Sequence, residues 1–297
     1  MPTKTPGRAQ PSQYYRPRWR RVMTVLVVLA VLAGGAVYAG ITIYRHVVVS
    51  LISPGCMAGL GANSTQVDPG QAPVAATIAG VAARMDLPRR ALEIAYATAL
   101  QESKMTNVPG GDRDSVGVFQ QRPSQGWGTA AQLQDPEFAS TAFFKALVKV
   151  PHYTTIPIYQ AAQDVQHSAD GSAYQQWEND AALLAASYTA TPHGVTCWYK
   201  PTSAGHPQLA SVTARIPVVF GSARSGAPVE GISRAGTALR VRVSSSQGWT
   251  VAHWLMTHAS MYGLTKVGYG GWQWSASLTE SAWQAAPGID AGSIVAS

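Results

Sequence analysis

The chain has 297 residues, of which 46% are hydrophobic and 12% are charged. This balance predicts a folded protein with buried cores and argues against extensive disorder. The first 45 residues carry seven of the 22 Lys and Arg residues and none of the 15 Asp and Glu residues. The net charge of +7 therefore belongs to the leader, while the rest of the chain is formally neutral, which excludes nucleic-acid binding as the main function.

An apolar segment follows the basic leader. Residues 22–44 contain no charged side chain, and as a helix they are about 34 Å long at ~1.5 Å per residue, enough to cross a hydrocarbon core of roughly 30 Å. We expect a transmembrane helix over 22–45, a cytoplasmic basic tail over 1–21, and extracytoplasmic domains beyond, by the positive-inside rule. The alternative is a signal peptide cleaved near Ala39, which would make the protein secreted.

Two cysteines, Cys56 and Cys197, flank the central part of the chain. Both are extracytoplasmic on this topology, where disulfides persist. We expect one bridge between them, which would stabilise the fold by about 4–5 kcal/mol in the chain-entropy description. Two free, buried thiols are the alternative.

Composition and periodicity divide the extracytoplasmic part. Residues 46–72 and 201–237 are rich in Gly, Ser and Pro and are predicted to be linkers. Residues 73–200 show helical periodicity and few strand patterns, which predicts a mainly α domain. Residues 238–297 predict a small α/β C-terminal domain.

The expected elements follow in chain order. In the central domain we expect helices over 73–85, 88–103, 135–147, from 158 onward, and 172–188. In the C-terminal domain we expect a strand, a helix and a strand over 239–243, 249–262 and 265–269.

Glu102 is the candidate general acid. Apolar residues of the helix over 88–103 recur at i, i+3 and i+4, and Glu102 continues this stripe in the last turn. Burial and the negative end of the helix dipole both favour the protonated carboxyl. Glycosidic cleavage uses that form to protonate the leaving oxygen. The alternative is a Glu that points to solvent at a frayed helix end.

The residues around Glu102 also resemble a known superfamily. The sequence QES at 101–103 is followed by SVGVFQQ at 115–121, and AASYTA occupies 185–190. These motifs resemble the lysozyme-like superfamily of soluble lytic transglycosylases and goose-type lysozymes, over residues 73–200. The stretch over 101–129 is similar to an actinobacterial branch of membrane-anchored cell-wall proteins. The resemblance implies a mainly α, lysozyme-like domain.

The resemblance also implies roles for individual residues. Glu102 matches the catalytic acid, Gln120 a substrate hydrogen-bond donor, and Tyr188 the tyrosine near the catalytic carboxyl, although Thr189 replaces the Asn that the motif usually carries. Trp127, in a Gly-flanked loop, is our candidate sugar-stacking face. The expected substrate-binding residues are Ser103, Ser115, Gly117, Val118, Phe119, Gln120, Trp127 and Tyr188.

The implied activity is a peptidoglycan lytic transglycosylase that acts on the MurNAc-GlcNAc β-1,4 bond in cell-wall remodelling. One carboxyl protonates the glycosidic oxygen and then acts as base on the muramyl 6-hydroxyl, closing a 1,6-anhydro ring. A muramidase, which hydrolyses the same bond, usually needs a second carboxylate. Asp112 and Asp114 are the candidates, unless they pair with Arg113 or cap the turn. The rival outside enzymes is a non-catalytic glycan-binding scaffold of a wall-spanning assembly.

The remaining motifs bear on cofactors and partners. The chain has no HExxH, no zinc-type cysteine spacing and no G-x-S-x-G, so we expect neither a metal nor another cofactor. The expected partners are peptidoglycan glycan strands, the membrane through residues 22–44, and cell-wall assembly partners through the C-terminal domain. Trp272 and Trp274 of that domain either bind wall polymer or form its core.

Overall fold

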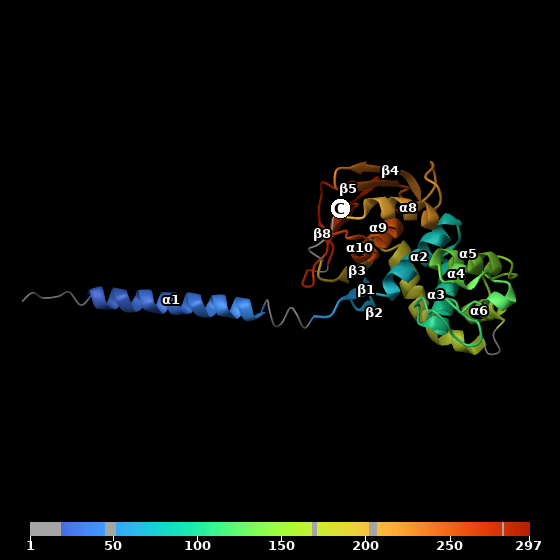
Figure 1. Cartoon of the computed structure of the whole chain (residues 1–297), viewed down its shortest axis with the longest axis horizontal. Coiled ribbons are helices and arrows are strands. Elements are labelled where there is room, and N and C mark those ends of the chain that lie inside the picture. The colour runs from blue at the N-terminus through green and yellow to red at the C-terminus, as the bar shows by residue number, and fades with distance from the viewer. Residues whose placement is uncertain (1–18, 45–51, 168–170, 202–206, 281) are drawn as a thin grey trace, which may run out of the picture. The chain divides into compact units, whose positions relative to one another are not determined.

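The computed structural model describes residues 19–44, 52–167, 171–201, 207–280 and 282–297. The chain divides into two compact units, Met1–Ile52 and Ser53–Ser297 (Figure 1). The second unit contains helices and two antiparallel sheets, so it is a mixed α/β structure.

The described residues of the first unit form the helix α1, over Trp19–Ile43. Its apolar span, Val22–Ile43, is long and apolar enough to cross a membrane, and a signal sequence near an N-terminus meets the same criteria. A long apolar helix is therefore confirmed over the described part of the expected span, while residue 45 and residues 1–18 of the expected tail lie outside the described residues.

Apart from α8 (Leu209–Phe220), the longer helices of the second unit form around the expected periodic segments. These are α2 (Gln71–Arg84), α3 (Arg89–Ser103), α5 (Pro136–Leu147), α6 (Ile158–Gln166), α7 (Glu178–Thr189) and α9 (Gly248–Thr257). Short helical segments are η3 (Pro123–Gln125), α4 (Ala130–Leu133), η4 (Gly171–Trp177) and α10 (Ala259–Tyr262). Two expected helices are each divided: η4 and α7 occupy 172–188, and α9 and α10 occupy 249–262.

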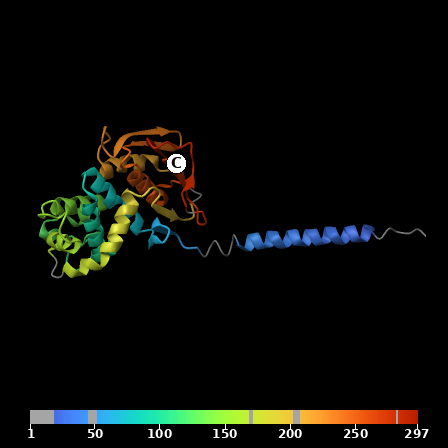
Figure 2. The ribbon, with the colours of Figure 1, turned by 180° about the vertical axis from the view of Figure 1, so that it is seen from behind.

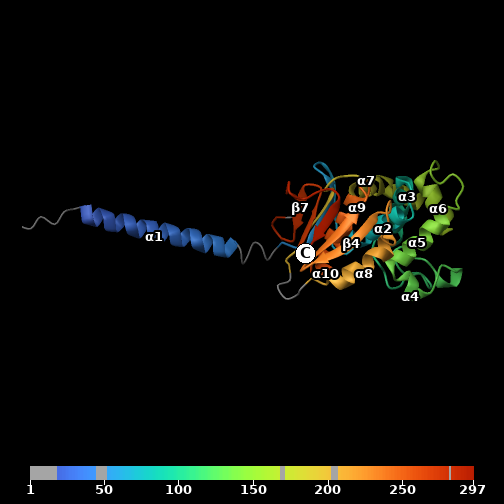
Figure 3. The same ribbon diagram turned by 90° about the horizontal axis from the view of Figure 1, so that it is seen from above.

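Helix α2 lies at the centre of the unit and contacts α3, α5, α7, α8 and α9. Seen from above, α3, α5 and α6 lie on one side of α2, and α8 and α9 lie on the other (Figure 3). Small residues cover α2 and let its neighbours approach closely. The clearest case is Gly80, where a Cβ atom would lie 2.4 Å from Val219 Cγ1 of α8.

A three-stranded sheet with the order β2-β1-β3 packs against α7. Its strands are β1 (Gly55–Leu60), β2 (Asn63–Val67) and β3 (Val195–Trp198). Cys56 faces Cys197 in the antiparallel register of β1 and β3, and the two form the predicted disulfide. The view from behind shows α7 running toward this sheet (Figure 2), and α7 contacts both β1 and β2.

A six-stranded sheet with the order β4-β5-β9-β6-β7-β8 forms the C-terminal part. Its strands are β4 (Val229–Ala235), β5 (Ala238–Val243), β6 (Lys266–Tyr269), β7 (Trp272–Ser275), β8 (Gln284–Ala285) and β9 (Ser293–Ala296). Helix α9 contacts β6 and β9 on one side and α2 on the other. The core is therefore continuous from the sheet through α9 to α2. Trp274 is fully buried in it, whereas Trp272 is half-buried.

Both predicted linkers are wrong within the described residues. The segment 46–72 contains the β1–β2 hairpin, in which Gly59 has a φ of 103° and leaves no space for a Cβ atom beside Asn63. The segment 201–237 contains α8 and β4. Small residues that suggest loops serve here in tight strand pairing and helix packing. The separate domain over 238–297 is also wrong, because its elements share one compact unit with the helices.

The disulfide should contribute strongly to stability. It joins cysteines 141 residues apart, so its removal frees a long loop in the unfolded chain, at a cost of about 5 kcal/mol in the chain-entropy description. We expect Cys56→Ala/Cys197→Ala to lower the free energy of unfolding by about that amount, measured by urea denaturation. A fall below ~1 kcal/mol would show that the unfolded chain is not constrained by the bridge.

Candidate functional site

Glu102 lies in the last turn of α3, where the helix ends abruptly. The next two residues, Lys104 and Met105, both have positive φ angles, of 54° and 56°, which is uncommon for residues other than glycine. The Met105 amide donates to Ala99 O at 2.8 Å, and the Met105 side chain is buried. The chain thus turns back into the core directly after Glu102, whose own position is half-buried.

The carboxyl of Glu102 is held by Tyr174. The Tyr174 hydroxyl donates to Glu102 Oε1 at 2.7 Å, and the residue is only 1% exposed. Its segment, η4, is tied to α3 because Trp177 Nε1 donates to Gln101 Oε1 at 2.8 Å. The Lys104 ammonium lies 4.3 Å from the centre of the Trp177 ring, a favourable cation–π distance. Among the described residues, none donates a hydrogen bond to the second oxygen, Glu102 Oε2.

Tyr188 does not have the role predicted for it. It is fully buried on α7, its hydroxyl donates to Ala72 O at 3.3 Å, and its ring meets Tyr96 edge-on at 6.1 Å. Burial raises the pKa of the Tyr188 hydroxyl well above its usual value. The tyrosine that contacts Glu102 is therefore Tyr174, and Tyr188 belongs to the core.

Ser103 joins the end of α3 to the turn at 117–120. Its hydroxyl donates to Val118 O at 2.7 Å. The turn itself requires Gly117, which has a φ of 79° and would place a Cβ atom 2.2 Å from Leu133 O. Ser103 thus positions the turn against the helix that carries the candidate acid.

The side chains of the turn face different ways. Val118 and Phe119 are fully buried, and the Phe119 ring stacks on Phe143 with 4.4 Å between ring centres. These two side chains therefore belong to the core, and a contact of this turn with glycan would use its backbone or Gln120. Gln120 is half-buried, and its side-chain amide donates back into its own turn at 3.0 Å. Ser115 is buried.

The Asp114 carboxylate forms hydrogen bonds within its own loop. Its carboxylate accepts hydrogen bonds from Arg122 Nε at 2.8 Å and from Ser124 N at 2.7 Å. These contacts, the Ser124 backbone N–H first, hold the pKa of Asp114 well below its usual range. Asp112 has 93% of its side chain exposed, and its Oδ2 lies 3.9 Å from Arg113 Nε, the pairing that was left open for these acids. Asp114 therefore has a structural role in its loop, with Arg122 rather than Arg113 as its partner. No described hydrogen bond joins either carboxylate to Glu102.

Trp127 is half-buried between Gly126 and Gly128, which have φ angles of 82° and 144°. It lines a cavity of about 390 Å³ together with Lys149 and Asp164. Its sugar-stacking role stays a prediction.

The sequence pattern does not reveal a second buried carboxyl, Glu137, in the first turn of α5. Arg215 of α8 binds both of its oxygens, with Nε donating to Oε1 at 2.6 Å, and also contacts Asp135 Oδ1 at 3.0 Å. Burial, followed by the neighbouring Asp135, raises the pKa of Glu137 to about 7. Because Arg215 occupies both oxygens, we interpret Glu137 as an ion pair between α5 and α8, and Glu102 as the better candidate acid.

One signal could have indicated Glu137. Asp135-Pro136-Glu137 is a capped helix start with an acid in the first turn, and Glu137 N does donate to Asp135 Oδ1 at 3.0 Å. Its partner Arg215 is 78 residues away in sequence, within the segment predicted as a linker, so the pair is invisible to local patterns.

Two histidines of the C-terminal part, His253 and His258, are buried. Nδ1 of His253 lies 3.2 Å from Tyr188 O, and Nδ1 of His258 lies 2.8 Å from Trp254 O. A carbonyl only accepts, so Nδ1 carries the proton in both rings. Burial lowers the pKa of each to about 4, which keeps both rings neutral near pH 7.

The comparisons with known proteins assign no family. No protein-family model and no curated protein matches this chain. Among the described residues, no three His, Cys, Asp or Glu side chains gather as a metal site would require. The candidate site is therefore defined by its residues and their geometry.

Stability should fall as the pH falls. The folded pKa of His253 and His258, about 4, lies below the unfolded value of about 6.5, so the unfolded chain binds more protons between these pH values. Each shift corresponds to roughly 3 kcal/mol. The raised pKa of Glu137 has the opposite effect on stability between about pH 4.5 and 7, because there the folded chain binds the extra proton. This one proton is outweighed by the two protons of His253 and His258.

We therefore expect a lower urea midpoint at pH 5 than at pH 7.5. His253→Gln should reduce this difference, because one of the two protons no longer contributes. His152→Gln, at an exposed position, is the matched control and should retain it. Equal midpoints of the original chain at the two pH values would contradict the buried, neutral state of these rings.

Proposed function

We propose that this chain is a peptidoglycan lytic transglycosylase that cleaves the MurNAc-GlcNAc β-1,4 bond with Glu102 as its single acid. The observation that carries the proposal is the setting of the Glu102 carboxyl. One oxygen is fixed by the Tyr174 hydroxyl at 2.7 Å, and the other accepts no hydrogen bond from the described residues. The motifs around Glu102, and the Ser103 contact that brings the glycine turn to the helix end, support the proposal.

The reaction needs one carboxyl used twice. Protonated Glu102 gives its proton to the glycosidic oxygen as the bond to the muramyl C1 breaks. The resulting carboxylate then takes the proton of the muramyl 6-hydroxyl as its oxygen bonds to C1, so the acid is restored and no water is consumed. Asp114, already bound by Arg122 and Ser124, is poorly suited to activate water, which favours this route over hydrolysis.

We further propose that α1 anchors the enzyme in the cell membrane, with its basic tail in the cytoplasm and the second unit outside. The Cys56–Cys197 disulfide suggests an extracytoplasmic location for that unit. The glycan strands of the wall would then be its substrate and its partner.

Replacement of the acid tests the proposal directly. Glu102→Gln keeps the shape of the side chain but removes the proton, so we expect muropeptide release to fall by at least about 1,000-fold. The assay is mass analysis of muropeptides released from purified peptidoglycan by the full-length chain in detergent.

Glu93→Gln is the matched control, because Glu93 lies on the same helix in an ion pair with Arg89 and should leave the rate almost unchanged. Glycan binding without product from either chain would indicate a non-catalytic scaffold. Products that carry only reducing-end muramic acid would instead indicate a muramidase.

Tyr174 should act as a positioning residue. Tyr174→Phe removes the hydrogen bond to Glu102 Oε1 but keeps the buried ring, so we expect kcat to fall about 10- to 100-fold with KM little changed. The pH profile of kcat should also shift, which a purely structural defect would not produce. Tyr159→Phe on α6 is the control, and an equal effect there would argue against a specific role of Tyr174.

A further inference from the structure

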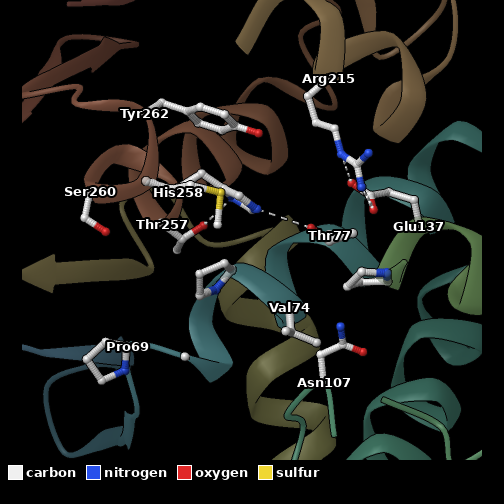
Figure 4. A pocket seen from close by; sticks show the side chains of 14 residues that line it. Pro69, Val74, Thr77, Asn107, Glu137, Arg215, Thr257, His258, Ser260 and Tyr262 are labelled. Carbon is white, nitrogen blue, oxygen red and sulfur yellow. Dashed lines mark hydrogen bonds and ion pairs between the residues drawn. The ribbon is translucent and has the colours of Figure 1, made fainter. Parts of the chain in front are cut away.

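We propose that a cavity between α2, α5, α8 and the α9–α10 junction binds a neutral saccharide (Figure 4). Its volume is about 570 Å³, within the usual range of small-molecule sites. Glu102 is not among its lining residues. The cavity would therefore be a second glycan site, and this reading rests on the proposed function.

The first argument is a polar network that is fixed before any ligand arrives. Trp254 Nε1 donates to Thr77 Oγ1 at 3.3 Å, and Thr77 Oγ1 lies 3.5 Å from His258 Nε2. Since Nδ1 of His258 carries the proton, Nε2 is an acceptor for the Thr77 hydroxyl. Figure 4 shows this contact on the cavity wall. Thr77 and His258 are therefore held in place at the cavity, as a preformed site requires.

The second argument is unused hydrogen-bonding capacity. Asn107 lines the cavity, and its Nδ2 donates to Gln134 O at 2.7 Å, which fixes the orientation of the amide. Its Oδ1 is buried below the cavity surface and has no hydrogen-bond partner among the described residues, so a ligand in the cavity does not reach it. The hydroxyls of Ser260 and Tyr262 also line the cavity, and neither forms a hydrogen bond with a described residue. These two hydroxyls can each donate and accept a hydrogen bond with a ligand.

The third argument is charge. The charged residues that line the cavity are Glu137 and Arg215, and they neutralise each other in a two-oxygen ion pair. Asp135 contacts the same guanidinium at 3.0 Å, so the cation has no surplus charge for an anion. A phosphate or carboxylate ligand would meet net negative charge. A ligand that is uncharged and rich in hydroxyl and amide groups fits best.

The fourth argument is the aromatic wall. The Tyr262 ring lies nearly parallel to the His258 ring, at 19° with 6.2 Å between centres. His258 in turn stacks on Trp254 at 4.3 Å. Tyr262 and His258 line the cavity, and the fully buried Trp254 ring supports His258 from behind. Figure 4 shows the Tyr262 hydroxyl directed toward Arg215. A sugar presents apolar C–H faces as well as hydroxyls, which matches a wall of this kind beside polar groups.

Methionine methyl groups provide local reporters. Met261 lines the cavity, whereas Met105 is buried three residues after Glu102. We would label the full-length Glu102→Gln chain in detergent with [¹³C-methyl]methionine and titrate it with N,N′-diacetylchitobiose. The inactive variant prevents turnover. We expect the Met261 resonance, assigned with Met261→Leu, to shift with saturation at millimolar concentrations.

A second variant tests the lining itself. Tyr262→Phe removes one unpaired hydroxyl and keeps the ring, so the Met261 titration midpoint should rise about 3- to 10-fold. Tyr269→Phe in β6 is the matched control and should leave it unchanged. The proposal is overturned if Met261 shows no saccharide-dependent shift, or if Tyr262→Phe leaves the midpoint unaltered.

Ligand class is tested in parallel. Inorganic phosphate and glutarate should not shift Met261, and a saturable shift with either would assign the cavity to anions and overturn the saccharide reading. Muropeptide release by the chain that retains Glu102 tests only the proposed enzyme activity. A Met261 shift without activity would therefore refute the enzyme and support the saccharide site. Activity without a Met261 shift would support the enzyme and refute the saccharide site.

Discussion

The close packing of helices around α2 is the constraint on which the rest of the second unit depends. Gly80 leaves α8 so near that a Cβ atom would lie 2.4 Å from Val219 Cγ1. That approach brings Arg215 of α8 to Glu137 of α5. At the other end of α2, Gln71 Nε2 donates to Lys104 O at 2.7 Å, which fixes the end of α3. The positions of the Glu102 and Glu137 carboxyls therefore both depend on one helix of small residues.

Sequence patterns predict the elements that are regular and locally encoded. The helices around Ile94 and Phe143 follow a 3.6-residue period, and their ends in the structure lie close to the expected ones. Composition fails where tertiary contacts decide. Gly59 and Pro217 suggest loops, yet Gly59 belongs to a paired strand and Pro217 lies inside α8. In both places long-range packing outweighs the local preference of one residue.

The candidate site shows the same division. Glu102 follows from a helix stripe, and Gly117 from a short motif whose turn requires glycine, and both are local features. The hydroxyl beside the carboxyl does not, because Tyr174 lies in a short irregular segment 72 residues further along the chain. Tyr188 occupies the motif position but points into the core. A motif places a residue on an element, whereas packing decides which way its side chain points.

The disulfide between β1 and β3 has a consequence for resistance to proteolysis. It makes the chain between Cys56 and Cys197 a covalently closed ring that contains α2, α3 and α7. A protease that cuts an exposed bond within this ring, such as one beside Asp112, opens the ring but releases no fragment. The two ends remain joined through sulfur and embedded in one core. Nicked molecules would thus keep Glu102 and Tyr174 together and separate only under reducing conditions.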